Sequence, residues 1–98
     1  MNKIVVLPLA KQDIREAAEW YENRKRGLGK VFTKSIRKKM AFVAKNPRAI
    51  AIRYKDTRTA ILDNFPYMIH FKYNQVNKTI VIIAVLSTHR NPDIWQNR

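Results

Sequence analysis

The sequence predicts an α+β domain in which two helices pack on one face of a small, mainly antiparallel, twisted sheet. An apolar run rich in β-branched residues opens the chain at residues 4–7, and two segments with helical apolar spacing follow between about residues 10 and 45. Every later segment has strand character, with polar turns between the strands. Because consecutive elements usually pack side by side, this gives the element order β-α-α-β-β-β. Since neither a linker-like stretch nor a repeat divides the chain, we expect one domain over residues 1–98.

The first strand and the first helix follow from residues 4–26. Pro8 ends the β-branched run of residues 4–7, which is too short for a helix. From about residue 10 apolar side chains recur at i, i+3, i+4 and i+7, on one helix face: Ile14, Ala17, Ala18 and Tyr21. Acidic residues lie in the first half of this segment and basic residues at its end, as the helix dipole favours. Gly27 and Gly29 then allow the chain to turn.

A second helix is predicted over residues 28–45. Its apolar stripe consists of Leu28, Phe32, Ile36, Met40 and Val43. Asn46 and Pro47 end the helix, because the residue before a proline disfavours helical geometry. The opposite face is basic, with Lys30, Lys34, Arg37, Lys38 and Lys45 near one line. We interpret this face as a solvated surface rather than as the active one.

The rest of the chain predicts an antiparallel meander. Strand character appears in residues 51–54, 57–62, 65–73 and 79–87, and side chains in the third of these segments alternate between two faces. Residues 80–86 are apolar on both sides, which is typical of a central strand. The helices would cover one side of it. Either a partner or the chain's own residues 93–95 would cover the other side.

Composition points to a negatively charged partner in the cytoplasm. The 98 residues include 20 Lys and Arg against 7 Asp and Glu, which gives a formal charge of +13. Such a chain attracts polyanions or acidic proteins. The absence of cysteine excludes disulfides, thiolate zinc sites and a cysteine nucleophile. The sequence contains neither a membrane-length apolar run nor a signal-peptide core, so we expect no membrane association and a cytoplasmic location.

Neither a metal nor a cofactor is expected. The two histidines, His70 and His89, are far apart in sequence and lack clustered acids, which makes a poor metal site. The chain also lacks the glycine-rich patterns that cradle phosphates in nucleotide-binding proteins.

Several short motifs, taken in order, resemble the RelE/ParE superfamily of toxins from type II toxin–antitoxin systems, which includes plasmid stabilisation proteins. They are Asp-Ile-x-x-Ala-x-x-Trp-Tyr at 13–21, Gly-Leu-Gly at 27–29, Asn-Pro at 46–47, Phe-Pro-Tyr at 65–67 and Val-Leu-x-x-His-Arg-Asn-Pro at 85–92. Each motif alone is weak, but their joint order is fairly specific. The resemblance covers nearly the whole chain.

The resemblance implies a small, basic, growth-inhibiting bacterial toxin that an acidic cognate antitoxin wraps and neutralises in a hetero-oligomer. The superfamily has two modes of action. ParE-like members inhibit DNA gyrase, whereas RelE-like members cleave mRNA in the ribosomal A site.

The resemblance also implies candidate site residues. Family nucleases carry basic residues on their middle strands and an arginine near the C-terminus. In this chain the corresponding regions hold Arg53, Lys55 and Arg58, and then Arg90. For nuclease chemistry the catalytic candidates are Arg58, Arg90 and His89, because cations stabilise the phosphorane and an imidazole carries protons. The candidates for nucleic-acid or target binding are Arg53, Lys55, Arg58, His70, Lys72 and Arg90. We expect the cations Arg53, Lys55, Arg58 and Arg90 to converge along the hollow of the sheet that the helices leave open.

Two departures from the nuclease pattern favour the ParE-like mode. Pro66 and Tyr67 stand where a strand-opening arginine is expected, and Trp95, whose indole is no acid or base, stands near the place of the terminal tyrosine. Gyrase inhibition needs no proton carrier. The RelE-like nuclease remains the alternative. A non-catalytic basic nucleic-acid-binding module is the third hypothesis, although the stacking aromatics of an RRM and the GxxG of a KH domain are absent.

Overall fold

A computed structural model of the chain describes residues 2–89 and confirms the predicted α+β architecture. The elements, in chain order, are β1 (Lys3–Val6), α1 (Pro8–Arg24), α2 (Leu28–Lys45), a 3-10 turn η1 (Pro47–Ala49), β2 (Ile52–Tyr54), β3 (Thr57–Ile61), β4 (Tyr67–Asn74) and β5 (Thr79–Ser87). The second helix has the predicted bounds, and the first begins at Pro8 instead of about residue 10. Pro8 is suited to this position, since its fixed φ fits a first helical turn and its missing N–H has no partner there in any case.

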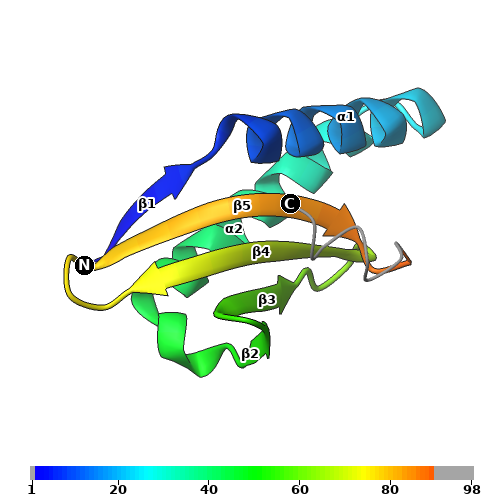
Figure 1. Cartoon of the computed structure of the whole chain (residues 1–98). Coiled ribbons are helices and arrows are strands. Elements are labelled where there is room, and N and C mark those ends of the chain that lie inside the picture. Colours follow the sequence, from blue (N-terminus) through cyan, green and yellow to red (C-terminus); the bar gives the residue numbers. More distant parts are fainter. Residues whose placement is uncertain (1, 90–98) are drawn as a thin grey trace.

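The strands form one sheet in the order β1-β5-β4-β3-β2. Only β1 and β5 pair in parallel, while the other pairs are antiparallel. Thus β5 is central, as its apolar sequence predicts. Figure 1 shows α1 along the β1 side of the sheet and α2 behind it in this view. Among the strands of residues 2–89, the short strands β1 and β2 form the two edges of the sheet.

A tight turn joins the helices. Gly27 has φ 89°, a left-handed conformation that glycine adopts without a Cβ clash. Gly29 lets the helices approach closely, since a Cβ there would lie 2.8 Å from the carbonyl oxygen of Ala18. The Glu22 carboxylate accepts hydrogen bonds from the backbone N–H of Gly27 (2.9 Å) and of Gly29 (3.0 Å). These two bonds, with a smaller contribution from Lys30, lower the pKa of Glu22.

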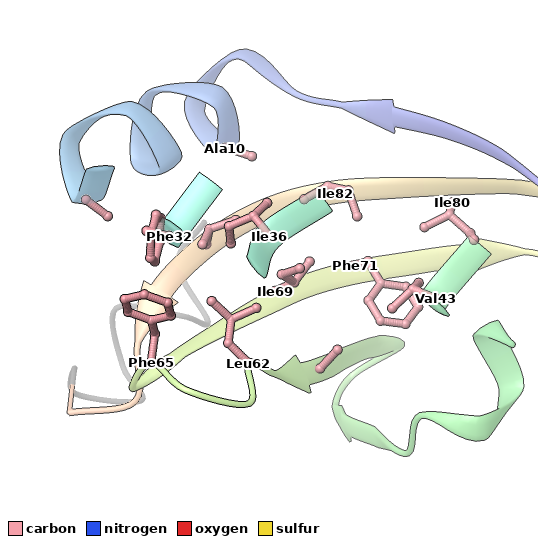
Figure 2. Close-up of a cluster of buried hydrophobic side chains, with 13 residues drawn as sticks. Ala10, Phe32, Ile36, Val43, Leu62, Phe65, Ile69, Phe71, Ile80 and Ile82 are labelled. Atoms are coloured by element: carbon pink, nitrogen blue, oxygen red, sulfur yellow. The ribbon is translucent and has the colours of Figure 1, made fainter. Parts of the chain in front are cut away.

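The main core lies between the helices and the sheet, where both predicted helix stripes pack (Figure 2). Phe32 is completely buried and its ring contacts three others: Tyr21 stacks on it, and Phe65 and Tyr67 meet it edge to face, with ring centroids 5.2–5.3 Å apart. Such aromatic pairs contribute beyond the area that they bury. This cluster fixes both helices against the start of β4.

The other face of the sheet carries a smaller cluster. Met68, Ala84 and Leu86 are buried there, with Tyr54 and Ile83 packed against them. His70 pairs with Ala84 and Phe71 with Ile82, so Ile83 is an extra residue in β5 and marks a bulge. We call this side the open face because the two helices lie on the other one. The possible cover by residues 93–95 lies outside the described residues.

No helix within residues 2–89 has the length and apolarity that crossing a bilayer requires.

Candidate functional site

His70 is held inside the open face. Its side chain is completely buried, and its Nδ1 lies 3.0 Å from the Tyr54 hydroxyl in a hydrogen bond. The sequence placed His70 on the face opposite the aromatic side chains of β4, and the structure agrees. Complete burial means, however, that His70 does not present its ring to a target in this conformation. Its predicted role in target binding stays a prediction.

Arg58 does not lie on the open face, so the expected convergence of cations in that hollow is wrong for this residue. Arg58 pairs with Phe71 across the β3–β4 ladder and therefore shares the helix-covered face with it. Its guanidinium Nη1 donates a hydrogen bond to the carbonyl oxygen of Ile50 at 2.6 Å. Arg58 thus ties the segment before β2 to the sheet.

The other predicted site residues lie towards two opposite ends of the sheet. Arg53 is exposed on the edge strand β2, and Lys55 follows in the β2–β3 turn. Lys72 is exposed near the end of β4, where its Nζ lies 3.5 Å from Asp56 Oδ1.

His89 follows β5 at the other end of the sheet, where Tyr67 pairs with Ser87. Positions 67 and 72 of one strand are roughly 17 Å apart at about 3.4 Å per residue. Arg90 lies outside the described residues.

A cavity of about 420 Å³ lies at the His89 end, between α1 and the ends of β4 and β5. We call it the strand-end cavity. It is lined by Asp13, Glu16, Ala17, Trp20, Tyr21, Pro66, Tyr67, Val85, Leu86, Ser87 and His89. Asp13 holds α1 to the sheet here, since its Oδ2 accepts a hydrogen bond from the Val85 backbone N–H at 3.0 Å. Ser87 Oγ accepts one from the His89 backbone N–H at 3.2 Å.

The strand-end cavity gathers groups that carry protons. Glu16 and His89 are both exposed, and the Tyr67 phenol lines the cavity with them. Burial, and then the neighbouring Tyr67, raises the pKa of Tyr21, so Tyr21 stays a neutral phenol at neutral pH. The cavity therefore offers a carboxyl group, an imidazole and two phenols within one concave space.

Of the residues that line this cavity, only His89 was a predicted site residue. The acids of α1 were attributed to the helix dipole, and Tyr67 was noted only because it stands where an arginine is expected. The available signal was spacing, because Asp13, Glu16 and Trp20 recur at i, i+3 and i+7 and so share one helix face. Tertiary packing, and not this spacing, sets which strand ends the helix face contacts.

A second hollow, which we call the helix groove, runs between α1 and α2. Ile14, Ala18, Gly29 and Thr33 line it together with a charged set: Lys11, Arg15, Glu19, Glu22, Lys30, Lys34 and Arg37. The groove therefore combines apolar and small residues with an excess of cations.

Residues 2–89 contain no group of three or more His, Asp or Glu placed to hold a metal ion. The expectation that neither metal nor cofactor is needed stays a prediction.

Comparison with solved structures identifies similar folds. A chain of the intact E. coli RelBE toxin–antitoxin complex is 18% identical with a TM-score of 0.65, and the match covers 92% of this chain and 100% of that one. The isolated E. coli RelE toxin is also 18% identical with a TM-score of 0.65, covering 99% and 95%. A chain of the chromosomal ParDE system of P. aeruginosa is 18% identical with a TM-score of 0.61, covering 89% and 96%. At these identities the likeness shows the fold alone.

Comparison of the sequence shows the family of the chain, which the likeness in fold does not. No curated protein sequence matched the chain. A family model did match, over residues 4–92, and its description is the ParE toxin of the type II toxin–antitoxin system parDE. The match covers β1 apart from Lys3 and every later element through β5. The chain therefore belongs to the ParE toxin family of type II toxin–antitoxin systems, within the RelE/ParE superfamily that its motifs resemble.

Proposed function

We propose that this chain arrests growth by inhibiting DNA gyrase and that an acidic cognate antitoxin neutralises it. The observation that carries the proposal is the family match over residues 4–92. The placement of the cations supports the same mode. A nuclease needs cations and proton carriers around one phosphate. Here Arg58 lies on the helix-covered face and Lys72 lies far along β4 from His89.

The helix groove is the proposed antitoxin site, which replaces our interpretation of the basic face of α2 as solvated, because Lys30, Lys34 and Arg37 line this groove. Ile14, Ala18 and Gly29 in its lining are apolar or small, and five lysines and arginines line it against two glutamates. An amphipathic helix with an apolar stripe and acidic flanks complements such a groove in both respects. The solved toxin–antitoxin complexes with similar folds support a protein partner of this kind.

The RelE-like nuclease is the second candidate, and one observation favours it. The strand-end cavity brings Glu16, Tyr67 and His89 together, and these are groups able to move the protons that RNA cleavage requires. In that case His89 and Glu16 would share the acid and base roles, with Arg58 in a structural role only.

Induction of the chain without its antitoxin separates the two candidates. A gyrase inhibitor induces the DNA-damage response before protein synthesis falls, whereas an mRNA nuclease stops protein synthesis within minutes and induces no early damage response. A reporter for DNA damage and the incorporation of a labelled amino acid, followed in one culture, measure both. Early loss of incorporation without damage signalling would overturn the proposal.

Charge reversal tests the antitoxin site. We expect Lys30→Glu/Lys34→Glu to remain toxic but to escape rescue by the antitoxin encoded beside it. The control Lys38→Glu/Lys45→Glu makes the same charge change on exposed positions of α2 outside the groove. Rescue of both variants would place the antitoxin elsewhere.

A further inference from the structure

Four exposed lysines gather at the end of the sheet opposite the strand-end cavity. They are Lys3 at the start of β1, Lys55 in the β2–β3 turn, Lys72 near the end of β4 and Lys78 before β5. In Figure 1 this is the end at which the N-terminus and the β4–β5 turn meet. We call this set the sheet-end lysines.

Pairing across the sheet places the four lysines along one end. Lys3 pairs with Thr79, and its backbone N–H donates to the carbonyl oxygen of Lys78 at 2.9 Å. Lys72 pairs with Val81, two residues further into β5. On the other side Lys72 Nζ lies 3.5 Å from Asp56, the residue after Lys55. This contact joins largely exposed groups and is therefore weak, although Asp56 still offsets one of the four positive charges.

The backbone at this end is strained at two of the lysines. Lys55 has φ 51° and Lys78 has φ 53°, and within residues 2–89 they are the only non-glycine residues with a positive φ. Glycine or asparagine adopts this conformation at lower cost, and hairpin turns usually use them. Lysine supplies a long cationic side chain instead. Strained conformations of this kind cluster at functional sites.

We propose that the sheet-end lysines form a binding surface for the phosphodiester backbone of a nucleic acid. The four lysines lie on successive parts of the sheet, from β1 through the start of β5 and the end of β4 to the β2–β3 turn, and so spread positive charge along this end. A line of point charges fits a repeating phosphate chain and needs no base recognition. This surface is separate from both the strand-end cavity and the helix groove. The inference goes beyond gyrase inhibition and does not depend on it.

The test replaces the two lysines that have a positive φ. In Lys55→Asn/Lys78→Asn, asparagine fits the left-handed conformation, so the melting temperature should stay the same or rise. Binding to a labelled DNA duplex of about 20 base pairs, followed by fluorescence anisotropy over a salt series, should nevertheless weaken. Each lost phosphate contact lowers the slope of log K against log salt by about 0.9, so two contacts lower it by about 1.8. Higher stability with weaker binding separates a functional surface from a solvated one.

Two matched variants control for total charge and for chain length. Lys25→Gln/Lys38→Gln removes the same formal charge at exposed positions outside this end and should leave the slope nearly unchanged. Lys55→Arg/Lys78→Arg keeps both charges and should bind like the wild type. A second arm with single-stranded RNA identifies which nucleic acid is preferred. Equal slopes for the Asn variant and the wild type in both arms, or an equal loss in the Gln control, would overturn the proposal.

Discussion

Replacing Arg58 tests whether its main role is to hold the sheet edge. The structure predicts that Arg58→Ala destabilises the domain because it removes the hydrogen bond from the guanidinium to Ile50. A hydrogen bond to a charged group contributes about 1.5–3 kcal/mol to stability. Arg58 is only partly buried, so we expect a loss of about 1.5–2 kcal/mol in the free energy of unfolding. A domain of this size has about 5–15 kcal/mol in total, so the variant still folds.

Urea unfolding followed by circular dichroism measures this loss. At about 4–8 °C per kcal/mol, the melting temperature should fall by roughly 6–16 °C. Arg58→Lys keeps the charge and most of the aliphatic stem but not the planar donor fork, and should lose about half as much. The control is Arg48→Ala, an exposed arginine on η1 that should change stability by less than about 0.5 kcal/mol. Equal stability of Arg58→Ala and Arg48→Ala would refute the structural role.

Three further substitutions probe the helices. Gly29→Ala gains about 1 kcal/mol of helix propensity but places a Cβ 2.8 Å from the Ala18 carbonyl oxygen, so we expect a net destabilisation of about 1–2 kcal/mol in urea. Glu22→Gln lowers stability at pH 7, and the difference from the wild type should disappear as pH falls through the lowered pKa of Glu22, because the wild-type carboxylate is then protonated as well. Ile36→Asp buries an unpaired charge and should abolish folding, seen as loss of the cooperative transition.

Matched variants in the same helices are the controls for these three substitutions. Ala41→Gly reports helix propensity alone at an exposed position of α2, and a stabilised Gly29→Ala would contradict the close contact. Glu19→Gln removes an exposed carboxylate of α1 and should show no comparable pH dependence. Val31→Asp adds the same charge at an exposed site of α2, so unfolding of that variant too would show that charge, not burial, is responsible.

The helices were predictable because their information is local. The stripe through Phe32, Ile36 and Val43 gave the span and the buried face of α2, and Gly27 gave the turn before it. The central position of β5 followed from residues 80–86, which are apolar on both sides. These features depend on periodicity and on single-residue conformational preferences.

The site was less predictable because it depends on how strands align. Arg58 was expected on the open face, although it shares its parity along β3 with Ala60 and with the buried Leu62. That pattern already favoured the helix-covered side. The bulge at Ile83 and the meeting of α1 with the ends of β4 and β5 carry no comparable local signal. The toxin assignment consequently rests on the family match and not on cations converging in one hollow.

The most direct measurement adds the purified chain to DNA gyrase and relaxed plasmid DNA. The ATP-dependent introduction of negative supercoils is then followed on a gel. A gyrase inhibitor blocks supercoiling in proportion to its concentration, and addition of the acidic antitoxin restores it. In a parallel reaction with ribosomes, mRNA stays intact. Full supercoiling at a large molar excess of the chain, together with cleavage of ribosome-bound mRNA, would contradict gyrase inhibition and assign the RelE-like mode.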